Sequence, residues 1–324
     1  MGKYFNVNGD CKRHLHYMIN IENRLIKIKE MVDKGEYFTI NRARQYGKTT
    51  TLKALKQFLN HDYIVINMDF QMFSASKFKN ENIFSVTFAA DFLDTMELYN
   101  PLPCSDIIDS LRNVLEHHKE DLELFELFRY LSKICAASLK PIVLMIDEVD
   151  SAANNQVFLD FLAQLRGYYM QRENKATFQS VILASVYDIK NIQQKFRDDT
   201  EHKVNSPWNI AADFLIDISF SSDEIAVMLE EYEKDHNISM DVAQISQLIY
   251  QYTSGYPYLV SKICKLMDER IIIDTEFPTL KSIWTKKGFL KAVRILLEES
   301  NMLFDSLIHK LETDSDLNKM LRNL

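Results

Sequence analysis

The sequence predicts an α/β protein, with a parallel five-stranded sheet covered by helices on both faces and a smaller helical region after it. Short apolar and β-branched runs alternate with helical patterns from the start of the chain to about residue 220, which is typical of a parallel sheet. One of these runs, PIVLMIDEVD, is apolar enough for a strand that is buried on both faces. From Ser221 onward only helical patterns follow.

The predicted elements of the sheet domain, residues 1–220, follow one another in a regular order. The strands are expected at residues 37–40, 62–70, 141–150, 178–188 and 212–220. Helical patterns flank the first strand, an insertion of about 72–140 is helical, and a further helix is expected over 154–170. This alternation predicts parallel strands whose connecting helices cover both faces of the sheet.

The rest of the chain is expected to form two helical parts. In residues 221–274, Ser221 and Glu224 have capping-box spacing, and Gly255 and Pro257 mark the end of one helix and the start of the next. Residues 275–324 are predicted to be a helical segment whose last apolar face continues to the final residue without a cap. That face consists of Leu317, Met320, Leu321 and Leu324. We interpret the segment as truncated, and expect the native protein to continue past its last residue.

The composition is that of an ordinary globular protein. Of the 324 residues, 47% are hydrophobic and 26% are charged, which is enough apolar material for a core. The formal charge of −8 and a pI near 5.6 argue against a surface that binds nucleic acid along its whole length. Four widely spaced cysteines and the lack of a charged-then-apolar leader predict reduced thiols in a cytoplasmic protein. No apolar run reaches the ~20 residues of a membrane helix, so we expect no membrane contact.

The stretch NRARQYGKTT lies between the first strand and a helix and predicts a phosphate-binding loop. The P-loop pattern is G-x-x-x-x-G-K-[ST], and Gly47, Lys48 and Thr49 fill its last three fixed positions, while Arg42 replaces the first glycine. Lys48 would reach the β- and γ-phosphates of a nucleotide, and the Thr49 hydroxyl would bind Mg²⁺. Arg42 and Arg44 could add positive charge there, or be solvated loop arginines. The predicted nucleotide-binding residues of the loop are Arg44, Gln45, Tyr46, Gly47, Lys48, Thr49 and Thr50.

A second motif supports this interpretation, because Gly-Lys-Thr alone more often lies in an exposed loop. The run VLMIDEVD ends in acids at the carboxyl end of a buried strand, where open α/β sheets bind ligands. Asp147 is expected to hold Mg²⁺, and Glu148 to activate the attacking water, with Asp150 as another candidate base. A strand that simply runs into an acidic turn is the alternative.

Together these motifs resemble the bacterial AAA-like ATPase family, which is related to the AAA+ and STAND P-loop ATPases. The resemblance is carried by YFTINRARQYGKTTTL, VLMIDEVD, NSPWNIA and SGYP, and it extends from about Tyr4 to the end. Members of the family replace the first P-loop glycine in the same way. The resemblance implies a P-loop NTPase sheet, a helical lid over the nucleotide, and a winged-helix module that begins near residue 275.

The resemblance also suggests roles for residues outside the two motifs. Ser185, at the end of the fourth predicted strand, would take the sensor-1 place; a satisfied strand-end serine is an equal alternative. Tyr17 and Pro257 match segments that lie by the adenine in similar ATPases, with ordinary packing as the alternative. Arg166, Arg172 and Arg197 are candidate arginine fingers, although most helix-surface arginines are simply solvated.

These residues predict an ATP- and Mg²⁺-dependent ATPase that acts as a switch or motor for an unidentified partner. The partner would be another protein or a second copy that meets the first across the nucleotide, and DNA would be contacted only through a C-terminal module beyond this chain. Two alternatives remain open. One is a STAND-like regulator that is gated by ATP or ADP with negligible turnover, and the other is a scaffold whose degenerate P-loop no longer binds nucleotide.

Overall fold

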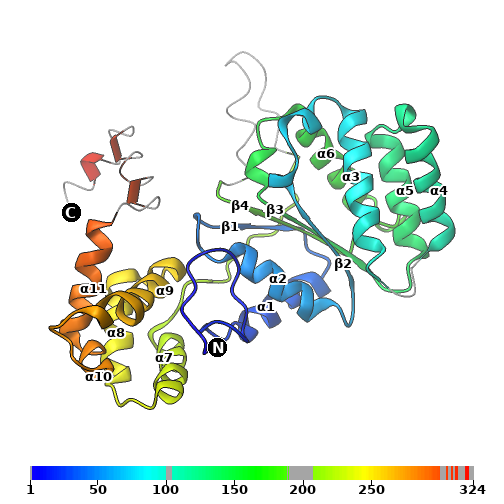
Figure 1. Ribbon diagram of the computed structural model, residues 1–324. Coiled ribbons are helices and arrows are strands. Elements are labelled where there is room, and N and C mark those ends of the chain that lie inside the picture. Colours follow the sequence, from blue (N-terminus) through cyan, green and yellow to red (C-terminus); the bar gives the residue numbers. More distant parts are fainter. Residues whose placement is uncertain are drawn as a thin grey trace. The chain divides into compact units, whose positions relative to one another are not determined.

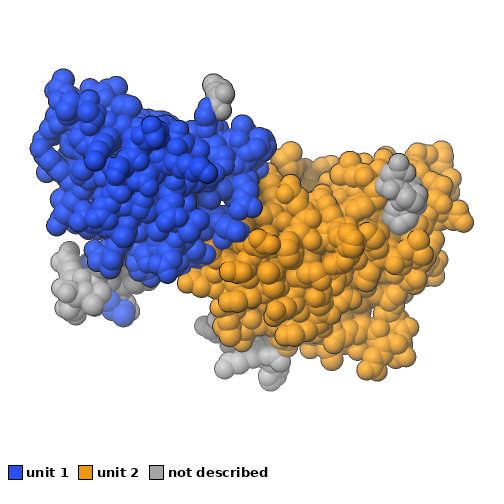
Figure 2. Space-filling view, turned by 90° about the horizontal axis from the view of Figure 1, so that it is seen from below, with its two compact units in different colours: residues 1–20, 44–47, 218–324 blue, residues 21–43, 48–217 orange. Residues whose placement is uncertain are grey.

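The computed structural model describes residues 2–99, 104–187, 189, 207–299, 304–305, 308, 311–312 and 318–320. Its contacts divide the chain into two compact units, which Figure 2 distinguishes by colour. Unit 1 comprises residues 1–20, 44–47 and 218–324, and unit 2 comprises residues 21–43 and 48–217. Within the described ranges, no helix combines the length and the apolar content that crossing a bilayer requires.

Unit 2 is built on a parallel sheet of four strands in the order β1-β4-β3-β2. The strands are β1 (Phe38–Asn41), β2 (Ile64–Asp69), β3 (Ile142–Asp147) and β4 (Ser180–Ser185). Every residue of β3 and of β4 is buried, as the apolar run in the sequence predicts. The register places Asp69 beside Asp147 and Asn41 beside Ser185, so polar residues gather at the carboxyl edge of the sheet.

The prediction of a fifth strand at residues 212–220 is wrong. This segment forms one isolated bridge, between Ala212 and Phe38, and no ladder. Two of its later carbonyl groups accept hydrogen bonds from arginine side chains instead: Ile216 from Arg42, and Asp217 from Arg24. The alternation of the sequence is nevertheless seen in burial, since Phe214 and Ile218 are buried while Leu215 is 88% exposed. Alternation reports which side chains face the core, and the backbone partners decide whether a strand forms.

Helices cover both faces of this sheet (Figure 1), as expected for a parallel sheet. Helices α1 (Glu22–Asp33) and α2 (Lys48–Leu59) lie on one face. Helices α3 (Glu81–Met96), α4 (Ser105–His117), α5 (Leu124–Ala137) and α6 (Gln156–Met170) lie on the other. The second group packs through many phenylalanines, among them Phe84, Phe88 and Phe161, whose rings contact one another.

The helices of unit 1 lie in its described part after residue 221. Its helices are α7 (Ser222–His236), α8 (Val242–Thr253), α9 (Pro257–Lys265), α10 (Leu280–Ile283) and α11 (Lys286–Glu298). Ser221 and Glu224 form the predicted capping box, and Pro257 is the first residue of α9. Leu317, Leu321 and Leu324, on which the predicted uncapped face depends, lie outside the described residues.

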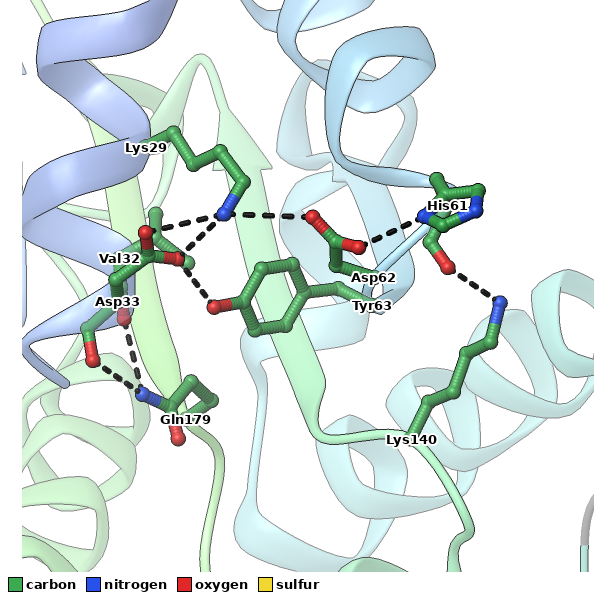
Figure 3. A network of polar contacts seen from close by, with 8 residues as sticks. All are labelled: Lys29, Val32, Asp33, His61, Asp62, Tyr63, Lys140 and Gln179. Atoms are coloured by element: carbon green, nitrogen blue, oxygen red, sulfur yellow. Dashed lines mark hydrogen bonds and ion pairs between the residues drawn. The ribbon is translucent and has the colours of Figure 1, made fainter.

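A network of polar contacts lies at the amino edge of the sheet in unit 2, where the chain enters β1, β2, β3 and β4 (Figure 3). Lys29 of α1 forms ion pairs with Asp33 and Asp62. Tyr63 donates a hydrogen bond to Asp33, and Gln179 donates to the carbonyl groups of Val32 and Asp33. These bonds tie the end of α1 to the segments that lead into β2 and β4.

Candidate nucleotide-binding site

The loop between β1 and α2 does not need a glycine at its first position. The Arg42 amide donates to the Ser185 carbonyl at 3.2 Å, so the chain is still paired with β4 where the P-loop pattern has its first glycine. The positive φ angles come later, at Gln45 (57°) and Gly47 (79°). Glycine adopts such angles without a steric penalty, and Gly47 is the fixed glycine of the pattern. Gln45 adopts its positive φ although it carries a side chain.

The side chain of Arg42 is directed along the sheet edge. Its guanidinium group donates to the carbonyls of Asn41 and Ile216, at 2.8 and 3.0 Å, and lies over the Phe214 ring, 5.7 Å from the centroid. The idea that Arg42 adds charge near the phosphates therefore has no support from its contacts. The arginine instead joins the first loop residue to the extended segment after residue 211.

Lys48 is the first residue of α2 and is only 5% exposed. Its ammonium group donates to the carbonyl oxygens of Arg42, at 2.9 Å, and Ala43, at 3.1 Å. The lysine thus reaches back over the loop from the amino end of a helix, where backbone N–H groups and the helix dipole favour anions. An ammonium group in this place can exchange carbonyl oxygens for phosphate oxygens.

Thr49 and Asp147 are in direct contact. The Thr49 hydroxyl donates to Asp147 Oδ2 at 2.6 Å, and the Glu148 amide donates to Asp147 Oδ1 at 2.9 Å. Burial raises the pKa of the Asp147 carboxyl, against the hydrogen bond from Thr49, which lowers it. A hydroxyl and a carboxylate side by side suit Mg²⁺, which commonly takes one or two protein oxygens and completes its shell with phosphate and water.

Glu148 follows β3 in a left-handed conformation, with φ of 52°. Burial raises the pKa of its carboxyl group, and the negative charge of Asp147 adds to this effect. A carboxyl group with a raised pKa is a better proton acceptor once it is ionised. Asp147 is buried and accepts hydrogen bonds from Thr49 and from the Glu148 amide, whereas Glu148 is only partly buried. This difference in surroundings allows the two adjacent acids different roles.

Ser185 ends β4 and is completely buried. Its hydroxyl group donates to the Tyr187 carbonyl at 2.6 Å, so the structure places a strand-end serine with a satisfied donor at the predicted sensor position. Asp150 accepts hydrogen bonds from the amides of Val186, at 2.6 Å, and Tyr187. The structure thus brings Lys48, Thr49, Asp147, Glu148 and Ser185 to one edge of the sheet.

The sequence analysis missed one acid at this edge, Asp69. Asp69 ends β2 in register with Asp147, and its charge contributes to the raised pKa of that residue. Its signal in the sequence was a second apolar strand ending in aspartate. Asp150 was considered only as a base, and its bonds to the chain after β4 could not be read from the sequence.

Two of the candidate arginine fingers, Arg166 and Arg172, lie in the described part of unit 2. Arg172 donates to the Gly35 carbonyl, before β1, and its guanidinium carbon lies 4.3 Å from the centre of the Tyr169 ring. It therefore lies near the amino edge of the sheet. Arg166 lies in the second half of α6, about 15 Å along the axis from the start of the helix. Arg197 lies outside the described residues.

Thr50 lies in α2 of unit 2, and the other remaining candidates belong to unit 1. Tyr17 is 2% exposed, donates to Asp235 at 3.1 Å and contacts the rings of Phe5 and Tyr232. Pro257 is buried at the start of α9. Just before it, Tyr256 donates to the Arg44 carbonyl and meets the ring of Tyr46 edge to face.

Comparison with solved structures shows a shared fold at low sequence identity. The chain is similar to the Walker-type ATPase PABY2304 of Pyrococcus abyssi, with 14% identity, a TM-score of 0.57, and coverage of 94% of this chain and 79% of that one. It is also similar to the ORC2 protein of Aeropyrum pernix, solved as ADPNP–ADP complexes, with 12% identity, a TM-score of 0.51, and coverage of 94% and 74%.

A third structure, the Aeropyrum pernix ORC1 protein in complex with DNA, has 10% identity, a TM-score of 0.47, and coverage of 86% and 66%. No curated protein matches the chain. The model of one family, however, described as the AAA-like domain, matches residues 14–312. With that match over most of its length, and with a P-loop ATPase fold, the chain belongs to the AAA-like domain family.

Proposed function

We propose that this protein binds ATP together with Mg²⁺ and hydrolyses ATP, as a switch or motor for a partner. The observation that carries the proposal is the hydrogen bond between Thr49 and Asp147 at 2.6 Å. It joins the end of the phosphate-binding loop to the end of β3, so that the two halves of a metal–phosphate site meet. Lys48 supplies the positive charge in the same loop.

Each residue of the site has a proposed role in binding or hydrolysis. Lys48 and the backbone N–H groups at the start of α2 would bind the phosphate oxygens and orient the γ-phosphate. Thr49 and Asp147 would hold Mg²⁺, which when bound neutralises charge that develops on the phosphates. Glu148 would accept a proton from the attacking water, for which its raised pKa is suited. We keep Tyr17 and Pro257 as proposed neighbours of the adenine.

A second candidate function is a nucleotide-gated regulator with little turnover by itself, and the placement of the two candidate fingers that the structure describes favours it. Arg172 lies at the amino edge of the sheet, and Arg166 in the second half of α6. An arginine finger would then come from a second copy or another protein, and such a finger contributes ~10³ to 10⁵ in rate. Arg166 remains our candidate for donation to a neighbouring copy.

Calorimetric titration tests the proposal. We expect wild-type protein to bind ATP and ADP with Mg²⁺, and to bind ATP more tightly than GTP. Asp147→Asn should weaken the binding of ATP with Mg²⁺ but change metal-free binding little, because only the metal contact is lost. Asp62→Asn, the same change at the opposite edge of the sheet, is the matched control and should leave both titrations unchanged. Wild-type protein that shows no heat of binding would support the scaffold alternative.

A further inference from the structure

The turn that carries Glu148 holds an unfavourable backbone conformation. Glu148 has φ of 52°, in the left-handed region, which an L-residue with a side chain adopts only at a steric cost. Such a conformation persists only where the surroundings determine it. The residues that follow, Val149–Ser151, form a single 3₁₀ turn with Val149 completely buried.

Two side chains of this turn bond to the chains that leave the neighbouring strands. Asp150 accepts from the amides of Val186, at 2.6 Å, and Tyr187, at 3.2 Å, just after β4. The single proton of the Ser151 hydroxyl has two acceptors, the carbonyl of Glu148 in the same turn, at 2.9 Å, and the carbonyl of Phe70, just after β2, at 3.0 Å. Because β3 lies between β2 and β4, the turn contacts the chain on both sides of it, and its two-bond attachment is the one to the chain after β4.

The bond to Tyr187 also reaches Ser185. The Ser185 hydroxyl donates to the carbonyl of Tyr187, whose own amide donates to Asp150. Each carboxylate oxygen of Asp150 accepts one of the two amides, Oδ2 from Val186 and Oδ1 from Tyr187. Both carboxylate oxygens of Asp150 therefore accept hydrogen bonds from backbone amides, whereas a general base must accept a proton from water.

We propose that Asp150 is a positioning residue, which fastens the Glu148 turn to the end of β4 and so fixes the general base and Ser185 relative to each other. Ser151 provides the weaker fastening toward β2. The role rests on the proposed ATPase function, in which the orientation of Glu148 toward water matters. A misplacement of about 1 Å in such a group can cost about 10²-fold in rate.

Asp150→Asn tests this role, because it keeps the size of the side chain and turns one acceptor into a donor that faces an amide. The matched control is Asp160→Asn on α6, whose carboxylate accepts a hydrogen bond from Gln156 of the same helix and from no other residue that the structure describes. Two quantities are measured for each variant. One is amide hydrogen exchange in the peptide that covers residues 180–187, and the other is steady-state ATP hydrolysis with its kcat and KM.

We expect Asp150→Asn to speed exchange at Val186 and Tyr187 and to lower kcat by about 10- to 10²-fold with KM unchanged. Asp160→Asn should resemble wild type in both, and Asp150→Glu, which keeps both acceptors, should recover part of kcat. Unchanged exchange in Asp150→Asn would overturn the fastening. Faster exchange with an unchanged kcat would overturn the positioning role. Faster exchange in a protein whose wild type hydrolyses nothing, even with cell extract, would instead count against the ATPase function and leave the fastening standing.

Discussion

The charged groups at the two edges of the sheet in unit 2 have different partners. At the amino edge, Lys29 pairs with Asp33 and Asp62 in one network (Figure 3). At the carboxyl edge, Asp147 and Glu148 stand side by side, and Lys48 donates to backbone carbonyls. At the first edge, one ammonium group forms ion pairs with two carboxylates. At the second edge, neither acid forms an ion pair with a cation among the described residues, although the charge of Lys48 favours the ionised form of both.

The pKa values follow this difference. Although burial alone would raise it, the pKa of Asp33 is lowered by hydrogen bonds from Lys29 and Tyr63. The pKa values of Asp147 and Glu148 are raised, in both cases chiefly by burial. An acid whose pKa is lowered in the fold stabilises the folded state when it is ionised, whereas an acid whose pKa is raised by burial destabilises it. A metal ion bound beside such an acid would offset that loss. The comparison thus separates an edge whose charges stabilise the fold from the edge at which we propose that nucleotide binds.

The largest expected effect is at Glu148. Glu148→Gln should lower hydrolysis by ~10² to 10⁴, because the general base is removed while the size is kept. ATP binding should stay at the wild-type level, since Lys48, Thr49 and the loop backbone supply the phosphate contacts. Steady-state hydrolysis and calorimetric titration measure the two quantities. Full activity in this variant would mean that another group acts as the base.

Lys48→Ala should weaken ATP binding by about 10²-fold, the loss of one or two hydrogen bonds to charged groups. The amino edge offers a matched control in Lys29→Ala, which removes an ammonium group from an ion-pair network. That variant should melt at a lower temperature but bind ATP as wild type does. Equal ATP affinities for Lys48→Ala and wild type would remove the binding role from this edge.

Tyr63→Phe removes a hydrogen bond from the network at the amino edge without removing a charge. It deletes the hydrogen bond to Asp33 from a ring that is 8% exposed, and should lower the free energy of unfolding by about 1 kcal/mol. Urea unfolding measures this, with Tyr252→Phe on an exposed position of α8 as control. A change in ATP affinity in Tyr63→Phe would show that the two edges are not independent.

The smallest effect concerns pH. The lowered pKa of Asp33 means that its ionised form stabilises the fold above the ordinary value of about 4, and that this contribution is lost as the pH falls through the lowered value. The free energy of unfolding of wild type should therefore fall more steeply below about pH 4 than that of Asp33→Asn. Parallel curves for the two proteins would contradict a native ion pair at this edge.

The carboxyl edge could be predicted from the sequence because its residues are consecutive. Lys48 and Thr49 follow one strand, Asp147 and Glu148 follow another, and parallel strands bring their carboxyl ends together. The amino edge could not be predicted, since Lys29, Asp62 and Tyr63 are ordinary surface types until the fold joins them.

The prediction of a fifth strand was wrong for a related reason. Periodicity of side chains says which face is buried, but it says nothing about the partners of the backbone. Here two arginine side chains take carbonyls that a ladder would have used. The hydrogen bonds of Asp150 could not be predicted for the same reason, because only the fold brings the amides of Val186 and Tyr187 to its carboxylate.

The late left-handed turn in the loop has a consequence for how such proteins are found. Since the backbone leaves the sheet after position 42 and turns at Gln45 and Gly47, the first glycine of the pattern has no geometric task in this chain. A search that demands this glycine would discard the sequence, whereas one that asks for a strand, a Gly-Lys-Thr and a distant acidic strand end would keep it. Gln45→Gly, which relaxes the turn, should be tolerated, while a β-branched residue there should not be.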